Sequence, residues 1–175
     1  GLAMHTYKLR LLPLLVLTPL ALPEILMGVS LLIFFVLLNM TLGMVSITLA
    51  HISFCIGFVA IVVRSRLAGM DESLVEAARD LGASPLDAFR LVTLPLIMPG
   101  VIAGALMAFT LSIDDFVITF FTAGAGASTL PLQIYSMIKI AVTPEVNAIS
   151  TLLMLLTLAL IVAASKLAPG AFRAN

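Results

Sequence analysis

Four long apolar stretches constrain this chain more than any other feature of its sequence. They cover residues 11–38, 44–63, 96–120 and 144–167. A helix needs roughly 20 mostly apolar residues to cross the hydrocarbon core of a bilayer, and all four stretches reach that length. The chain is 62% hydrophobic and 10% charged, whereas a soluble domain is about 45–50% apolar and about 25% charged. We therefore predict an all-α, polytopic helical membrane protein in which residues 1–175 form one transmembrane domain.

Proline positions refine the first and the last of these predicted spans. The first stretch contains three prolines, and we expect it to kink or break around Pro19–Pro23 because proline cannot continue the helical hydrogen-bond ladder. The fourth stretch begins with Thr143 at the N-cap position and Pro144 at the first helical position, which is typical of a helix start.

The distribution of positive charge predicts the orientation of the spans. Lys and Arg collect in the cytoplasmic segments of membrane proteins. If both ends of the chain are cytoplasmic, eight of the nine cations lie on that side and Lys139 is the exception. We therefore predict four spans with both ends in the cytoplasm, a cytoplasmic loop over 64–95 and an outer loop over 121–143. The eight cytoplasmic cations are Lys8, Arg10, Arg64, Arg66, Arg79, Arg90, Lys166 and Arg173.

The cytoplasmic loop has the pattern of two short helices joined by a glycine. Asp71 can cap the first helix, and Gly82 allows the left-handed turn that commonly ends one. Ser84 as N-cap, Pro85 at the first position and Asp87 at the third start the second helix. Spacings of three and four residues give the first helix an apolar stripe of Leu74, Ala77, Ala78 and Leu81.

Two helices this short need other parts of the protein or a partner to pack against, because an isolated helix shorter than about 12 residues is only marginally stable in water. Leu86, Phe89 and Leu91 add apolar surface to the second helix. We interpret the loop as a docking element, with the membrane domain on one side and a partner on the other. A connector that lies at the membrane surface without a partner is the alternative.

The residues from 76 to 95 also match a known spacing. Glu76-Ala77-Ala78 is followed, after three intervening residues, by Gly82 and then, after nine more intervening residues, by Val92 and Leu94-Pro95. This spacing resembles the signature cytoplasmic loop of ATP-binding-cassette (ABC) importer permeases, with Val92 at the position that is usually Ile. The resemblance implies that the loop docks into an ATPase subunit. The implied coupling residues are Glu76, Ala77, Ala78, Gly82, Ser84, Pro85, Leu94 and Pro95.

The resemblance continues beyond the loop. Residues 112–117, 130–137 and 144–148 look like the permease subunits of bacterial polyamine importers, in particular the second permease of the spermidine/putrescine system. Importers of iron, thiamine and aminophosphonates share much of this framework, so another small solute is an alternative. Permeases with this type I ABC importer fold usually have six spans. We therefore expect the four spans here to belong to a longer protein whose first two spans would precede Gly1.

The resemblance also implies partners. These are a cytoplasmic ABC ATPase dimer, a second permease subunit and a periplasmic substrate-binding protein, all serving a small cationic substrate at the bacterial inner membrane. The sequence contains no G-x-x-x-x-G-K-[ST] phosphate loop, so we expect no cofactor in this chain and ATP with Mg²⁺ in the partner ATPase. A net charge of zero gives no indication of nucleic-acid binding.

Charged residues within spans are costly and therefore suggest function. We take Glu24 and one of Asp114 or Asp115 as candidate weak sites for the ammonium groups of a polyamine along a substrate pathway, with Tyr135 as a further candidate. The alternatives are that the Asp pair caps the following loop and that Tyr135 is an interfacial anchor. His51 is expected to be satisfied by hydrogen bonds within its span rather than to bind a ligand.

Two other classes of function remain as alternatives. An ion-coupled secondary transporter or channel could use Glu24 and Asp114 or Asp115 for its ion. Such a transporter would predict matching broken spans in two related halves, which the sequence does not show. A membrane anchor or assembly scaffold is the third class. No clustered nucleophile and base and no His/Cys metal spacing support an enzyme, so a transport subunit is the leading prediction.

Overall fold

The computed structural model describes residues 11–167, and the side chains of residues 16–166. This part of the chain forms helices and no strand, which confirms the all-α prediction for the described residues. In chain order the elements are α2 (Leu11–Ala21), α3 (Glu24–Leu37), α4 (Met44–Ala68), α5 (Ser73–Asp80), α6 (Pro85–Ala88), the π-helical turn η1 (Phe89–Thr93), α7 (Leu94–Asp114), α8 (Val117–Thr122), α9 (Leu130–Ile138) and α10 (Pro144–Leu167).

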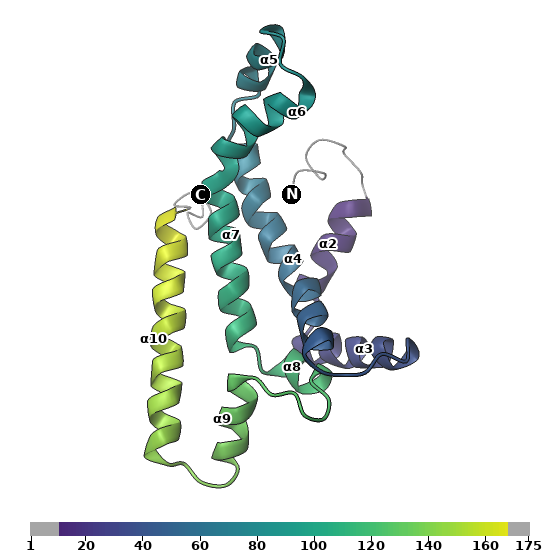
Figure 1. Ribbon diagram of the computed structural model, residues 1–175, viewed down its shortest axis with the longest axis vertical. Coiled ribbons are helices and arrows are strands. Elements are labelled where there is room, and N and C mark those ends of the chain that lie inside the picture. The colour runs from purple at the N-terminus through teal and green to yellow at the C-terminus, as the bar shows by residue number, and fades with distance from the viewer. Residues whose placement is uncertain (1–10, 168–175) are drawn as a thin grey trace.

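Three long helices run along the molecule's long axis in alternating directions (Figure 1). Those long and apolar enough to cross a membrane are Met44–Ala68, Pro85–Asp114 and Pro144–Lys166. They correspond to the second, third and fourth predicted spans. The bounds differ at three places: α4 continues to Ala68 instead of residue 63, the third helical segment begins at Pro85 instead of residue 96, and it ends at Asp114 instead of residue 120.

The first predicted span is corrected to two helices. The expected break is present: Pro23 has an extended ψ of 135° and directly precedes α3. The ring of a proline disfavours a helical conformation in the residue before it, so α2 cannot run into α3. Figure 1 shows α2 beside α4 and α3 lying across the long axis. With 14 residues, α3 is shorter than the roughly 20 residues of a span, so residues 11–38 are not one continuous crossing.

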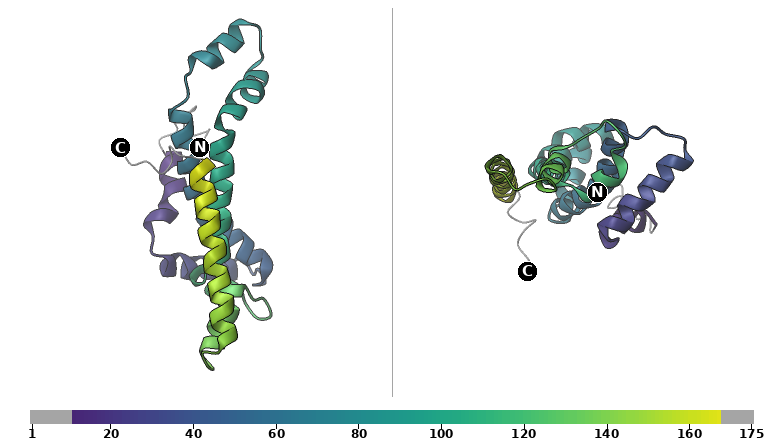
Figure 2. Two further views of the ribbon diagram at one scale, coloured as in Figure 1. Left: turned by 90° about the vertical axis from the view of Figure 1, so that its left-hand side faces the viewer. Right: turned by 90° about the horizontal axis from the view of Figure 1, so that it is seen from below.

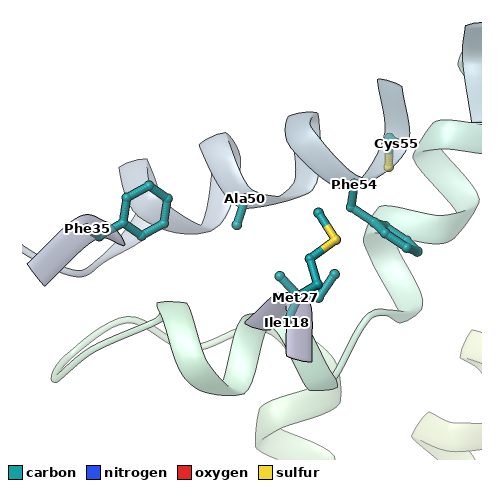
Figure 3. Packing of buried hydrophobic residues seen from close by; sticks show 6 residues of the cluster. All are labelled: Met27, Phe35, Ala50, Phe54, Cys55 and Ile118. Carbon is teal, nitrogen blue, oxygen red and sulfur yellow. The ribbon is translucent and has the colours of Figure 1, made fainter. Parts of the chain in front are cut away.

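A buried cluster explains the crosswise position of α3. Helices α3, α4 and α8 meet around Ile118, which is fully buried (Figure 3). Gly28 of α3 lies so close to α8 that a methyl group there would come within 2.7 Å of the Phe121 ring. The cluster therefore depends on the change of chain direction between α7 and the short helix α8. Its buried members are Met27, Phe35, Ala50, Phe54, Cys55 and Ile118.

Helix α10 packs against α7 along one seam and exposes the rest of its surface (Figure 2). The seam residues are spaced by four and three in alternation, which keeps one face of a helix toward its neighbour. The opposite face is apolar and exposed, with Leu152, Leu155 and Leu158 among its members. The buried and half-buried residues of the seam are Val146, Ser150, Leu153, Thr157, Leu160 and Ala164.

Candidate functional site

The predicted docking element projects beyond the ends of α4 and α7, at the end of the molecule opposite α8 and α9 (Figures 1 and 2). It consists of α5, α6 and the turn between them, as the sequence predicted. No residue of α5 is buried. The rest of the described chain therefore leaves α5 uncovered.

Local hydrogen bonds hold α5 at both ends. The carboxylate of Asp71 accepts a bond from the Ser73 N–H at 3.0 Å. Bonding from the Ser73 hydroxyl, and then from its N–H, lowers the pKa of Asp71, so this cap stays ionised at neutral pH. At the other end, Gly82 has φ +90°. The Gly82 N–H donates to the Arg79 carbonyl at 2.9 Å and the Ala83 N–H to the Ala78 carbonyl at 3.0 Å. This pair of bonds is a Schellman motif, which ends a helix.

Helix α6 begins with the capping arrangement that the sequence predicted. The Ser84 hydroxyl accepts a bond from the Asp87 N–H at 3.2 Å and donates to the Asp87 carboxylate at 2.6 Å. Pro85 follows at the first helical position. Ser84 and Asp87 thus fix the direction in which the second helix leaves the turn.

The helix continues from α6 into α7 through one wide turn, η1. Its defining bond runs from the Leu94 N–H to the Phe89 carbonyl, five residues back. Pro95 comes next; it has no N–H, and in a regular helix its ring would clash with the carbonyl four residues earlier. A wide turn immediately before a proline removes that clash without ending the helix. Leu94 and Pro95 therefore begin the membrane-crossing part of a continuous helical segment.

The surface of the docking element combines exposed leucines with a polar hollow. Leu81 is 90% exposed and Leu86 is 54% exposed. Beside them lies a hollow of about 480 Å³. Large exposed apolar side chains next to charged ones are typical of a protein–protein interface. Glu76, Gly82 and Pro85 line the hollow, whereas Ala77 and Ala78 lie outside it. The hollow is lined by Glu76, Arg79, Asp80, Gly82, Ala83 and Pro85.

At the opposite end, the structure separates the two adjacent aspartates. Asp114 is exposed and lines a cavity of about 380 Å³ between the end of α7, α9 and α10, together with Phe116 and Tyr135. Asp115 is buried and caps α8, because its carboxylate accepts bonds from the Thr119 N–H at 2.8 Å and the Thr119 hydroxyl at 2.7 Å. The capping alternative therefore describes Asp115, and Asp114 is the member of the pair that faces a cavity.

At this end of the molecule, His51 connects α4 to α7 and α8 through its side chain. Its Nδ1 lies 2.7 Å from the Ser112 hydroxyl, and its Nε2 lies 2.8 Å from the Thr119 hydroxyl and 3.3 Å from Asp115. The Thr119 hydroxyl gives its proton to Asp115, so it accepts from His51, and Nε2 must carry a hydrogen. A hydrogen-bonded His51 was predicted. Its connection to Asp115 was missed, although polar residues at positions 51, 112 and 119 of apolar segments were a visible signal.

Glu24 and Tyr135 lie apart from each other. Glu24 is the exposed first residue of α3, where the positive end of the helix dipole suits a carboxylate, and it does not line the Asp114 cavity. Tyr135 lies on α9 with its ring centroid 4.6 Å from that of Phe116. Of the four predicted pathway residues, the structure thus brings together Asp114 and Tyr135 in one cavity.

The positive charges of the described residues are distributed unevenly between the two ends of the molecule, as the sequence predicted. Five cations lie in the docking element or in the adjoining ends of the long helices, and Lys139 lies at the opposite end after α9. Together with the membrane-length helices and the uncovered helical pair, this asymmetry defines a multi-pass membrane protein with a docking element at one end. The five cations are Arg64, Arg66, Arg79, Arg90 and Lys166.

Comparison with known proteins identifies the family. Residues 5–170 match the family described as "binding-protein-dependent transport system inner membrane component", and the chain belongs to that family. It is therefore a membrane component of a transport system rather than an enzyme, as the sequence predicted.

Individual relatives support this membership. The chain is 46% identical over 153 residues to the spermidine/putrescine transport system permease protein PotC of Escherichia coli K12, covering 87% of this chain and 58% of the relative. It is 49% identical over 142 residues to the putrescine transport system permease protein PotI of the same organism, covering 78% and 50%. PotC of Haemophilus influenzae is 46% identical over 140 residues, covering 80% and 54%. The chain spans between half and three-fifths of the length of these relatives.

Proposed function

We propose that this chain forms part of a permease subunit of an ATP-driven importer of polyamines such as spermidine and putrescine. In this proposal a periplasmic binding protein delivers the substrate, and a second permease subunit completes the pathway. A cytoplasmic ATPase dimer binds ATP and Mg²⁺ and docks on α5 and α6. The observation that carries the proposal is the uncovered pair α5–α6, whose ends are fixed by its own hydrogen bonds and whose leucines are exposed. The names of the relatives support the choice of substrate.

The geometry suggests how docking is coupled to transport. The helical segment Pro85–Asp114 has 30 residues and, at about 1.5 Å per residue, reaches roughly 45 Å. One end of it belongs to the docking element and the other end carries Asp114. Movement of α5 and α6 by the ATPase would therefore shift the Asp114 end of the same helix. No further connecting element is needed between the site of ATP hydrolysis and the outer end of the pathway.

Asp114 and Tyr135 are the side chains that we propose to contact the substrate. A carboxylate attracts the ammonium groups of a polyamine, and the face of an aromatic ring adds a cation–π attraction of about 0.5–1 kcal/mol at an exposed site. Both contacts are weak enough to allow release. Asp115 then acts as a positioning residue that caps α8, and Glu24 is a separate candidate near the start of α3.

The coupling role is tested in the full-length permease assembled with its second permease, ATPase and binding protein. We expect Glu76→Lys to reverse a charge in the docking hollow and Gly82→Pro to destroy the turn, so that both abolish ATPase co-purification and uptake of labelled spermidine. Glu72→Lys is the matched control, because it makes the same charge change outside the hollow. Intact ATPase binding and uptake in Glu76→Lys and Gly82→Pro would overturn the docking role.

The substrate is tested in the same assembly by neutral replacements. Asp114→Asn and Glu24→Gln should raise the polyamine concentration needed for uptake without preventing assembly, because each removes one carboxylate. Unchanged uptake in both variants would contradict the proposed pathway. Competition of labelled spermidine uptake by iron, thiamine or an aminophosphonate, instead of by putrescine, would assign the importer to another solute.

A further inference from the structure

Lys139 is the exception to the charge distribution of this molecule. The other cations among residues 11–167 lie toward the docking end, whereas Lys139 follows α9 at the opposite end. A positive charge there opposes the usual bias of membrane proteins. It also lies at the entrance that a cationic substrate would use in the proposed function. Since the Lys139 ammonium would repel a cationic substrate at this entrance, its position suggests a specific role for Lys139.

The Lys139 ammonium is seated on an aromatic ring. Its nitrogen lies 4.6 Å from the centroid of the Tyr135 ring, within the range of a cation–π contact. Tyr135 and Lys139 are four residues apart at the end of α9, so their side chains share one face of the helix. In the described part of the chain no carboxylate lies within ion-pair distance of Lys139, so the ring is its partner.

The same ring belongs to the cavity that holds Asp114. Tyr135, Phe116 and Asp114 line it, with Tyr135 and Phe116 in ring contact at 4.6 Å. Within residues 11–167, Asp114 has no cation partner within 4 Å. A carboxylate without a cation partner beside aromatic faces is the chemistry that recognises an alkylammonium group. Lys139 itself ends in such a group and lies over the Tyr135 ring, although it is not among the residues that line the cavity.

We propose that the Lys139 ammonium competes for the Tyr135 ring with primary alkylammonium groups that bind at this ring and Asp114, and that substrate displaces it from the ring. This inference rests on the proposed function and deepens it. An incoming ammonium gains the attraction of Asp114 and the ring, and Lys139 swings away into water. The tethered cation thereby weakens substrate binding and prevents a trap at the pore entrance.

The test measures how well n-butylammonium inhibits uptake of labelled spermidine by the complete transporter in proteoliposomes. Every variant is assembled with the same binding protein and ATPase, so differences between variants report on the permease. Lys139→Met vacates the ring, and we expect the inhibitory concentration of n-butylammonium to fall about two- to fivefold, the size of an exposed cation–π contact. Lys139→Arg keeps a cation on the ring and should leave it unchanged. 1-Butanol, which has the same chain without the charge, should not inhibit.

A second substitution distinguishes displacement from general repulsion. In a Tyr135→Leu background there is no ring to vacate, so Lys139→Met should no longer change the inhibitory concentration. Tyr135→Phe keeps a ring face and should preserve the Lys139→Met effect, also where Tyr135→Leu transports too slowly to measure. An equal effect of Lys139→Met with and without the ring, or no effect in the wild-type and Tyr135→Phe backgrounds, would overturn the inference. Absence of spermidine uptake by the wild-type complex would instead refute the proposed function.

Discussion

His51 illustrates how polar side chains are accommodated within the membrane-crossing part of this protein. A polar group in an apolar environment is costly unless its hydrogen bonds are satisfied. His51 of α4 meets Ser112 of α7 and Thr119 of α8, and Thr119 also donates to Asp115. One imidazole thus joins three helices around a buried carboxylate. The network holds α8 at an angle to α7, which leaves Asp114 facing the cavity.

Replacing His51 with leucine should destabilise the protein. The imidazole is removed from between Ser112 and Thr119, and the buried Asp115 loses a neighbour that lies 3.3 Å away. Leaving buried polar partners unsatisfied costs about 1–3 kcal/mol, so thermal unfolding in detergent should begin several degrees lower. Thr48→Val is the control, because the Thr48 hydroxyl is exposed and bonds only within its own helix, to the Met44 carbonyl. Equal melting of both variants would contradict the structural role of the network.

The two aspartates show what sequence reasoning could and could not supply at this scale. It could predict that at most one of Asp114 and Asp115 faces a pathway, because neighbouring helical residues point about 100° apart. It could not predict which one. That choice depends on the end of α7 at Asp114, and this end depends on the capping of α8 by Asp115. The Asp pair interrupts the apolar pattern over residues 96–120, but the pattern alone does not show that the helix ends there.

At the scale of elements, the turn between α5 and α6 depends on a left-handed glycine. A methyl group on Gly82 would meet no atom within 4 Å, so any effect of Gly82→Ala comes from the backbone alone. With φ +90°, an L-residue is strained by about 1 kcal/mol or more. We expect faster hydrogen exchange of the α5 amides and weaker ATPase co-purification. Gly69→Ala has φ −92° and similar open space, and should change neither.

The seam between α7 and α10 gives a second test at this scale. Leu153 lies on the seam and its neighbour Leu152 is 67% exposed on the opposite face. Leu153 is half-buried and also lines the Asp114 cavity beside α9. Leu153→Ala removes part of this packing and should lower the free energy of unfolding by about 2 kcal/mol, at the lower end of the range for core truncations. Leu152→Ala removes the same atoms from a surface that is equally apolar in lipid and should have little effect. Unfolding in mixed detergent measures both, and a larger effect at Leu152 would show that α10 packs through its other face.

The helix ends were predictable from the sequence where hydrogen bonds between residues close in the chain determine them. The caps of α5 and α6 involve residues no more than five positions apart, and the structure reproduces Gly82 and Ser84 in the predicted roles. Residues 11–38 were predicted less well. Pro23 predicted the break between the two helices. The crosswise packing of α3, however, depends on Ile118 and Phe121 of α8, which is far away in the sequence. The sequence of α3 contains no local pattern that predicts this contact.

At the scale of the whole molecule, the candidate functional residues lie at two opposite ends. One end carries the docking element and most of the described positive charge, and the other carries Asp114, Tyr135 and Lys139. A single helical segment, Pro85–Asp114, reaches from one to the other. The exposed apolar faces of α3 and α10 are available for contact with lipid. The arrangement agrees with a subunit that transmits movement and carries out no chemistry of its own.

This division predicts which parts of the protein can be reached from each side of the membrane. Ser73 begins α5 in the docking element, and Ser128 lies in the loop before α9. Both are exposed, and they lie at opposite ends of the molecule. In a Cys55→Ala background of the full-length permease, a membrane-impermeant thiol reagent applied to spheroplasts should label Ser128→Cys. It should label Ser73→Cys only after the membrane is permeabilised, because the positive charge near α5 predicts that this end lies in the cytoplasm. A cysteine added after Asn175 tests the predicted cytoplasmic location of the chain end by the same assay. Labelling of Ser73→Cys in intact spheroplasts would reverse the orientation, and an ATPase in the cytoplasm could then no longer reach α5 and α6.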